Sequence, residues 1–157
     1  MAVKPIPEGY HSITPYLICS GAAKAIDFYK QAFGAVELFR MEMKPGHIGH
    51  AEMKIGDSIV MLADEFPEMN IKSPTTMGGS PVGILLYITD CDAVFKKAVD
   101  AGAKVDRPLQ DQFYGDRSGT VIDPYGHKWT IATHKEDLSP EEMQKRGDEW
   151  KKKQGGG

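Results

Sequence analysis

Hydrophobic and polar positions follow the same order of elements twice along this chain. In the first copy, apolar side chains recur at helical spacing from Ala22 to Phe33, and Gly34 supplies a C-terminal stop signal. The strand-like segments around this helix are 12–19, 36–43, 48–55 and 58–63. The pattern predicts a β-α-β-β-β unit.

The second copy repeats this order after a shift of 68 positions, which places Ala25 on Ala93 and Gly34 on Gly102. Its helix is predicted over 91–101. Its strands are predicted over 83–89, 104–109, 117–122 and 127–133. Two copies of one unit in a short chain predict two equivalent modules.

The chain between and after the two copies has a different character. Residues 64–82 collect Pro, Gly, Ser and Thr and are predicted to form a linker. Ser139, followed by Pro and two Glu, forms a capping box that predicts a tail helix within 135–157. Met143 and Trp150 give this helix a narrow apolar stripe. We expect the stripe to dock on the domain or on a neighbouring subunit.

These elements predict an α+β fold of two tandem βαβββ modules, followed by a C-terminal helix. The predicted single domain spans 1–134 and consists of a module over about 9–63 and a module over about 83–134. At 157 residues, the chain is long enough for the two modules to share one core.

Composition and charge exclude several classes of function. The chain is 41% hydrophobic and 26% charged, which is ordinary for a globular protein. Its formal net charge of −3, without a basic stripe, gives no reason to expect nucleic-acid binding. Its apolar runs fall far short of the roughly 20 residues that span a bilayer, so we expect no membrane partner.

Cysteine usage and the N-terminal segment bear on the compartment. Cys19 and Cys91 are too few and too far apart for a disulfide framework or a CxxC zinc site. The N-terminal segment carries proline and charge where a signal peptide needs an apolar stretch. We therefore expect a cytoplasmic protein.

Three segments together carry a family resemblance: TPYLICSGAAKAIDFYKQAFGA, GHAEMKIGDSIVMLADE and GDRSGTVIDPYGHKW. With the repeated module, they resemble the vicinal oxygen chelate superfamily of glyoxalases, bleomycin-resistance proteins and dioxygenases, and within it the PhnB-like branch. The resemblance covers roughly residues 9–134. It implies that the two modules form a curled mixed sheet around a cavity and that the chain forms a homodimer. The long linker leaves swapped and unswapped dimers open.

The resemblance also implies a metal position in the cavity. In the metalloenzymes of this superfamily, four inward side chains hold a divalent cation. Matching the motifs places these positions at Thr14, Val60 or Met61, Gly83 and Thr130. None offers the imidazole, carboxylate or thiolate that Zn²⁺, Fe²⁺ or Mn²⁺ requires. We therefore expect no resident metal and no other cofactor.

Histidines elsewhere in the chain offer one alternative. Strand alternation puts His50 and Glu52 on one face, which makes them candidates for a displaced metal site. Hydrogen bonding in a pocket wall is the competing interpretation. His127 follows the glycine of the DPYG turn and is expected at the surface, whereas Trp129 is expected in the core.

Strand alternation, counted from the four positions, predicts a mostly apolar cavity. The ligand-binding residues that we predict are Thr14, Tyr16, Leu85, Tyr87, Asp116, Arg117 and Thr130. Tyrosine supplies both stacking and hydrogen bonding, which suits a planar or aromatic ligand. Asp116 and Arg117 either pair with each other at the surface or fix a polar group of the ligand.

The sequence therefore predicts a metal-independent small-molecule-binding protein of bleomycin-resistance type, with an apolar or aromatic ligand between the modules. Non-catalytic binding is favoured because the scaffold is intact while the metal positions are lost. Two alternatives stay open. One is a lyase, isomerase or dioxygenase with a rearranged site at His50 and Glu52, and the other is a structural or regulatory partner protein that uses the tail helix.

Overall fold

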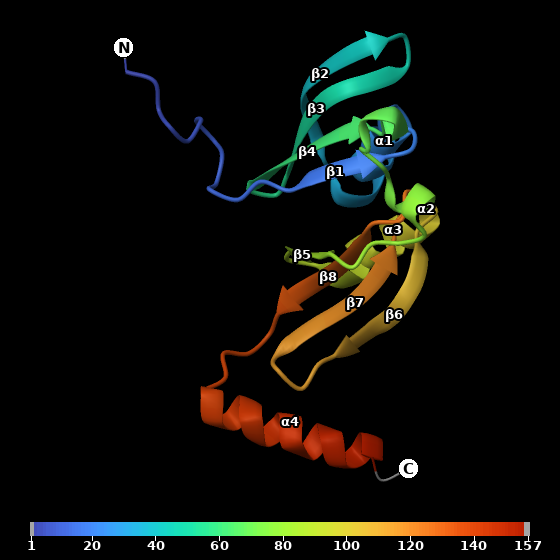
Figure 1. Cartoon of the computed structure of the whole chain (residues 1–157). Coiled ribbons are helices and arrows are strands. Elements are labelled where there is room, and N and C mark those ends of the chain that lie inside the picture. Colours follow the sequence, from blue (N-terminus) through green and yellow to red (C-terminus); the bar gives the residue numbers. More distant parts are fainter. Residues whose placement is uncertain (1, 156–157) are drawn as a thin grey trace.

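The computed structural model describes residues 2–155, which form eight strands and five helical segments (Figure 1). The elements of the first module are β1 (Tyr16–Cys19), α1 (Ala22–Phe33), β2 (Val36–Lys44), β3 (His47–Ile55) and β4 (Ser58–Asp64). Its strands form a mixed sheet in the order β1-β4-β3-β2. The pair β1 and β4 is parallel, and the other pairs are antiparallel.

The second module repeats this architecture. Its elements are β5 (Gly83–Tyr87), α3 (Cys91–Asp100), β6 (Lys104–Asp111), β7 (Asp116–Ile122) and β8 (Lys128–His134). The strand order β5-β8-β7-β6 matches that of the first module. The predicted α+β class and the two tandem modules are confirmed. Within the described residues, the strands are hydrogen-bonded as two separate four-stranded sheets.

Equivalent glycines end the helices and turn the hairpins of the two modules. Gly34 (φ 68°) follows α1, and Gly102 (φ 119°) follows α3. Gly56 (φ 59°) and Gly126 (φ 88°) lie in the hairpins before β4 and β8. A residue with a side chain is strained in this left-handed region. Both copies therefore need glycine at these positions, which makes the repeat detectable in the sequence.

The first strand is shorter than predicted. It begins at Tyr16 rather than at residue 12. Pro15 has no N–H to donate to a strand ladder, although its carbonyl oxygen accepts a hydrogen bond from the Met61 N–H at 2.9 Å. The chain before Tyr16 therefore approaches β4 without forming a regular strand.

The linker contains two short helical segments, η1 (Pro67–Met69) and α2 (Pro74–Met77). They were not predicted, because the sequence of the linker has no helical periodicity. The Glu65 carboxylate accepts hydrogen bonds from the Ser73 N–H at 3.0 Å and from the Thr76 hydroxyl at 2.8 Å. The linker is thereby folded back on itself next to β1 and is not an extended tether.

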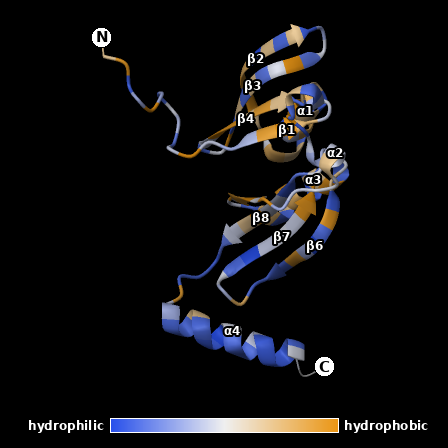
Figure 2. Ribbon diagram, viewed as in Figure 1, coloured by the Kyte–Doolittle hydropathy of each residue, from blue (hydrophilic) through white to orange (hydrophobic). Residues whose placement is uncertain are grey.

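The tail forms α4 (Pro140–Gly155), which is hydrophilic along most of its length (Figure 2). The predicted cap is present, since the Ser139 hydroxyl oxygen accepts from the Glu142 N–H at 3.1 Å. Trp150 packs on Phe113, with ring centroids 5.7 Å apart, and Arg146 pairs with a carboxylate before the helix. Trp150 of the stripe thus docks on the chain's own β6–β7 connection. None of the helices within residues 2–155 has the length and apolar character that a bilayer crossing requires.

A shared hydrophobic core joins the two modules. Helix α1 packs against α3, and Trp129 of β8 lies against Tyr29 and Phe33 of α1, with ring centroids 5.4 and 4.7 Å apart. Trp129 is buried, as predicted. The modules therefore meet through their helices and through the strand that follows the DPYG turn.

Asp123, in the DPYG turn, is the polar centre of this junction. Its buried carboxylate accepts hydrogen bonds from the Tyr29 hydroxyl (2.5 Å), Trp129 Nε1 (2.9 Å) and the His127 backbone N–H (2.9 Å). The expectation of a surface His127 is wrong. The side chain is buried and its Nε2 donates to the carbonyl oxygen of Ile18 at 2.9 Å, because the turn packs against the first module.

Candidate functional site

Each sheet has one face covered by its helix and one face that is open. In the first sheet, Leu17 and Cys19 of β1 are buried toward α1. Tyr16, the first residue of β1, points the other way and keeps 47% of its surface exposed. In the second sheet, Leu85 and Tyr87 are 49% and 58% exposed. We call these surfaces the first and the second open face. Strand alternation is the reason for both.

The first open face is a row of side chains across four strands. Tyr16 is paired with Met61, Met61 with Glu52, and Glu52 with Phe39. Met41 is paired with His50 one step further along, and it is also exposed. The register settles the choice left open by the hairpin, since Met61 and not Val60 lies on this face.

A chain of hydrogen bonds crosses the first open face. The Tyr16 hydroxyl lies 2.8 Å from Nδ1 of His50, and Nε2 of His50 lies 2.9 Å from a carboxylate oxygen of Glu52. The predicted placement of His50 and Glu52 on one face is therefore correct. Burial raises the pKa of Tyr16. Thr14, before β1, lines a hollow with Glu52 and Met61 on the same face.

The second open face is more polar at its centre. Leu85 is paired with Thr130, and Thr130 with Thr120, and the two threonine hydroxyls lie 2.9 Å apart. Tyr87 is paired with Ala132 on the next row. The face therefore combines two half-exposed apolar side chains with a hydroxyl pair in the sheet.

A second hydrogen-bonded chain runs from Tyr87 toward the tail. The Tyr87 hydroxyl donates to Asp116 at 2.7 Å, and the other oxygen of Asp116 lies 2.7 Å from Nδ1 of His134. His134 Nε2 lies 2.7 Å from Asp137. The hydrogen bond to Asp116 raises the pKa of Tyr87, and the carboxylates of Asp116 and Asp137 raise the pKa of His134. This chain ties the second open face to the segment before α4.

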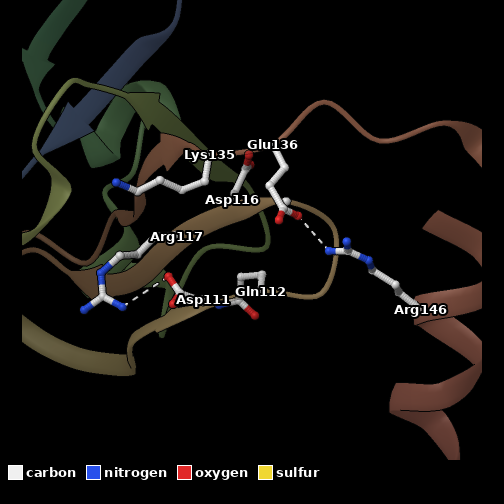
Figure 3. A pocket seen from close by; sticks show the side chains of 8 residues that line it. Asp111, Gln112, Asp116, Arg117, Lys135, Glu136 and Arg146 are labelled. Carbon is white, nitrogen blue, oxygen red and sulfur yellow. Dashed lines mark hydrogen bonds and ion pairs between the residues drawn. The ribbon is translucent and has the colours of Figure 1, made fainter. Parts of the chain in front are cut away.

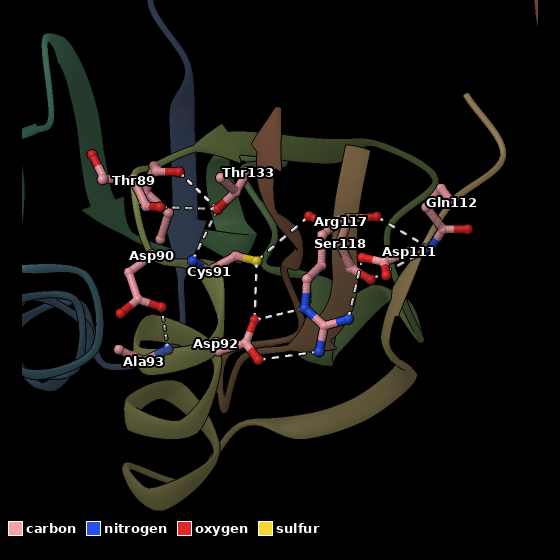
Figure 4. Close-up of polar contacts among 11 residues, drawn as sticks. Thr89, Asp90, Cys91, Asp92, Ala93, Asp111, Gln112, Arg117, Ser118 and Thr133 are labelled. Atoms are coloured by element: carbon pink, nitrogen blue, oxygen red, sulfur yellow. Dashed lines mark hydrogen bonds and ion pairs between the residues drawn. The ribbon is translucent and has the colours of Figure 1, made fainter. Parts of the chain in front are cut away.

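Arg117 does not join Asp116, because neighbouring strand residues point to opposite faces of the sheet. Its guanidinium lies on the α3 side, where it pairs with Asp92 at 2.8 Å and with Asp111 at 3.4 Å (Figure 4). Of the two alternatives for Asp116 and Arg117, a surface pair between the two side chains is therefore wrong.

A charged hollow of about 580 Å³ lies between the β6–β7 connection and the tail (Figure 3). Arg146 pairs with Glu136 at 2.7 Å, and Arg117 pairs with Asp111 at 3.4 Å. Because charged and polar side chains line the hollow, it offers little to an apolar ligand. Asp116 lines this hollow and also reaches Tyr87.

The predicted ligand residues are thus divided between two faces. The first open face holds Thr14 and Tyr16, and the second holds Leu85, Tyr87 and Thr130, with Asp116 at its end. Sequence reasoning missed Phe39, Met41 and His134 as members of these faces. The alternation within 36–43 places Phe39 and Met41 on one side of the strand, and this was the available signal.

The four family positions do not fit a divalent cation. They hold two hydroxyls, a thioether and no side chain at all, at Thr14, Thr130, Met61 and Gly83. Over residues 2–155, no three His, Cys, Asp or Glu side chains cluster closely enough to hold a metal ion. His50 uses both ring nitrogens in hydrogen bonds, so a cation there has to displace Tyr16 or Glu52.

Paired βαβββ modules with one open face each define a class of protein, the vicinal oxygen chelate fold. The sequence model described as the Glyoxalase/Bleomycin resistance protein/Dioxygenase superfamily matches residues 10–131. The chain belongs to this superfamily.

The chain is also similar to known proteins and solved structures. The uncharacterized protein Mb0911c of Mycobacterium bovis is 43% identical over 136 residues, which cover 85% of this chain and 90% of the relative. TioX from Micromonospora sp. ML1 has a similar structure, with a TM-score of 0.62 and 26% identity, and the match covers 82% of this chain and 100% of TioX. The At5g48480 gene product of Arabidopsis thaliana gives a TM-score of 0.63 and 28% identity over 78% of this chain and 98% of its own.

A PhnB protein from Bacillus cereus also shares the fold, with a TM-score of 0.58 over 78% of this chain and 99% of its own. Its identity of 17% shows the fold alone. The assignment to the PhnB-like branch within the superfamily therefore stays a prediction.

Proposed function

We propose that this protein binds an apolar or aromatic small molecule without a resident metal, and that two copies of the chain complete each binding site. The chemistry of the four family positions carries the proposal. Thr14, Met61, Gly83 and Thr130 preserve the scaffold around the position of the metal but not the donors that hold it. The protein acts as a carrier or sequestering protein on this account.

The open faces support an aromatic ligand. Tyr16 and Phe39 on the first face and Tyr87 on the second are each about half exposed, so their rings are available for stacking. The Tyr16 and Tyr87 hydroxyls and the Thr130 hydroxyl supply directional hydrogen bonds. An apolar wall with a few fixed polar groups is the usual character of a small-molecule site.

A second copy of the chain is proposed because of the way in which the two modules meet. Within one chain they contact each other through α1 and α3, so the shared core lies on the covered sides of the two sheets. Apolar side chains on both open faces remain exposed, and such patches mark interaction surfaces. In the homodimer that we propose, the first open face of one chain meets the second open face of its partner.

The ligand contacts that we propose are Thr14, Tyr16, Leu85, Tyr87, Asp116 and Thr130, to which Phe39 and Met41 are added. Arg117 is left out because it pairs with Asp92 on the other side of the sheet. A cytoplasmic location is also our proposal. It is supported by Cys19 and Cys91, which are both buried and free.

Elemental analysis and a ligand screen test the proposal together. Protein purified without chelators should carry far less than one equivalent of Zn, Fe, Mn or Ni per chain. A panel of planar aromatic compounds, screened by calorimetry, should contain saturable ligands. One equivalent of a transition metal that survives dialysis would favour a metal-dependent enzyme instead. Failure of the whole aromatic panel would contradict the proposed ligand class.

A further inference from the structure

We propose that Tyr16, His50 and Glu52 form a proton relay that takes the proton of an acidic hydroxyl group, phenolic or enolic, on a ligand bound at the first open face. The inference rests on the proposed function in one respect, because it requires a ligand at this face. It adds a chemical step to binding, and it names the class of ligand as a phenol or an enol.

The relay is built by strand register. Met61 of β4 is paired with Tyr16 on one side and with Glu52 on the other, so β1 and β3 present their side chains to the same face. His50 lies two residues before Glu52 and therefore shares that face. The result is a continuous path from the Tyr16 hydroxyl through the imidazole to the Glu52 carboxylate, with separations of 2.8 and 2.9 Å.

The Glu52 carboxylate, at the end of the path, fixes the direction of both hydrogen bonds. An ionised carboxylate only accepts, so Nε2 of a neutral His50 carries the proton and donates it to Glu52. Nδ1 is then an acceptor, and the Tyr16 hydroxyl donates to it. A base oriented by a third group and hydrogen-bonded to a hydroxyl is the arrangement that activates that hydroxyl.

The surroundings of His50 favour this direction of the hydrogen bonds, from Tyr16 through His50 to Glu52. Phe39 lies beside the imidazole, with ring centroids 6.3 Å apart, and the side chains of His50 and Glu52 are 24% and 18% exposed. The titratable neighbours are Tyr16 from β1, Glu52 from β3, and Tyr10 and His11, which line the hollow shared by Glu52 and Thr14. Because the pKa of Tyr16 is raised by burial, its hydroxyl keeps a proton to pass on at neutral pH.

The transfer balances without any further reactant. The ligand O–H bond breaks and its proton moves to the Tyr16 oxygen, while the Tyr16 proton moves to Nδ1 of His50. The ligand is left as a phenolate or enolate anion, Tyr16 is unchanged, and His50 becomes an imidazolium paired with Glu52. An imidazole is suited to this role because its protonation changes near neutral pH.

The β6–β7 connection supplies a matched control. Tyr114 is also a partly exposed tyrosine, and its ring packs edge-on against Phe113, with ring centroids 5.3 Å apart. It belongs to neither open face and is not among the ligand contacts that we propose. Tyr114→Phe therefore removes a comparable hydroxyl without touching the relay or the binding site.

The test uses 4-nitrophenol, whose absorbance reports its ionisation. Bound to the wild-type protein, the probe should ionise at a pH lower by about 1 unit or more than in free solution. His50→Gln and Tyr16→Phe should abolish that shift, Glu52→Gln should reduce it, and Tyr114→Phe should retain it. Fluorescence titration of each variant measures probe affinity separately, and near-ultraviolet circular dichroism checks that each variant is folded.

Three results overturn the relay. The first is a bound probe with the ionisation of the free probe, and the second is an equal shift in folded His50→Gln protein. Both leave the proposed binding function intact, because the probe is still bound. The third is a wild-type protein that does not bind 4-nitrophenol at all, in which case the aromatic panel decides the binding function independently.

Discussion

At the scale of single residues, Asp123 is the side chain on which the junction between the modules depends most. Its carboxylate is only 3% exposed and satisfies donors from both modules, among them Tyr29 and Trp129. Loss of a buried acceptor leaves these donors unpaired, which is more costly than the loss of one bond.

Asp123→Ala should therefore lower the free energy of unfolding by about 3 kcal/mol or more, because several buried donors lose their partner. Tyr29→Phe, which removes one hydrogen bond and little volume, should lower it by about 1 kcal/mol. Urea unfolding followed by circular dichroism measures both. Equal losses in the two variants would show that the carboxylate does not organise the junction.

His134 gives a prediction about pH. The pKa of this histidine is raised in the folded protein, first by Asp116 and then by Asp137. A raised folded-state pKa means that the protonated form is stabilised by folding, so the contribution is present below the unfolded pKa and is lost as pH rises through the folded value.

The stability lost in His134→Gln should thus be larger at about pH 5.5 than at about pH 9. Asp137→Asn removes one of the two carboxylates and should show a smaller difference of the same sign. Thermal unfolding of both variants and the wild type at the two pH values is the measurement. An equal loss at both values would mean that the two carboxylates do not act on His134 in this way.

Single residues also show the limit of sequence reasoning. Trp129 was predictable as a core residue, because it alternates with Thr130 on a strand with one covered face. The ion pair of Arg117 was not predictable, because its partner Asp92 lies 25 positions away at the start of α3. The burial of His127 depends on contact with the other module, which a local pattern does not encode.

At the scale of elements, the packing of β7 against α3 is tight at one glycine. A Cβ at Gly119 would lie 2.6 Å from the ring of Phe95 and 3.0 Å from the backbone nitrogen of Leu109. Both neighbours are held in place, Phe95 by the core and Leu109 by its own strand. The helix can therefore approach the sheet only because residue 119 has no side chain.

Gly119→Ala should destabilise the protein by about 1–3 kcal/mol through overpacking. Gly83→Ala is the matched control, because a Cβ there meets only the flexible end of Lys128 at 4.0 Å. The control should stay within about 0.5 kcal/mol of the wild type, as surface changes usually do. Denaturant unfolding of the pair tests the contact, and a neutral Gly119→Ala would contradict it.

Elements were predicted well where the pattern repeated over several turns. Helix α1 was expected to begin at Ala22 and end before Gly34, and it does. The two short helical segments of the linker were missed, because four or fewer residues are too few to establish a helical period. The order of strands within each sheet was not predicted, because the pattern along the chain does not say which strands are neighbours.

At the scale of the whole molecule, the fold of a single chain does not explain why apolar side chains are exposed on the two open faces. Leu85 and Tyr87 on one face and Phe39 and Met41 on the other are each about half exposed. On our account, a second copy of the chain covers them and encloses the ligand.

Leu85→Glu should therefore weaken the dimer and ligand binding together. Val105→Glu is the matched control, since Val105 is 50% exposed and Leu85 is 49% exposed, but Val105 is paired with the buried Val121 on the covered side of the sheet. Sedimentation velocity should show a dimer for the wild type and the control, and a monomer for Leu85→Glu. A dimer of unchanged stability in Leu85→Glu protein would place the interface elsewhere.

The most direct test of the account is a calorimetric titration of EDTA-treated protein with an aromatic ligand from the screen, repeated after one equivalent of Zn²⁺ is added. The account predicts saturable binding to the metal-free protein, near one ligand per chain, with an affinity that added Zn²⁺ leaves unchanged. Binding that disappears after chelation and returns with the metal would contradict it.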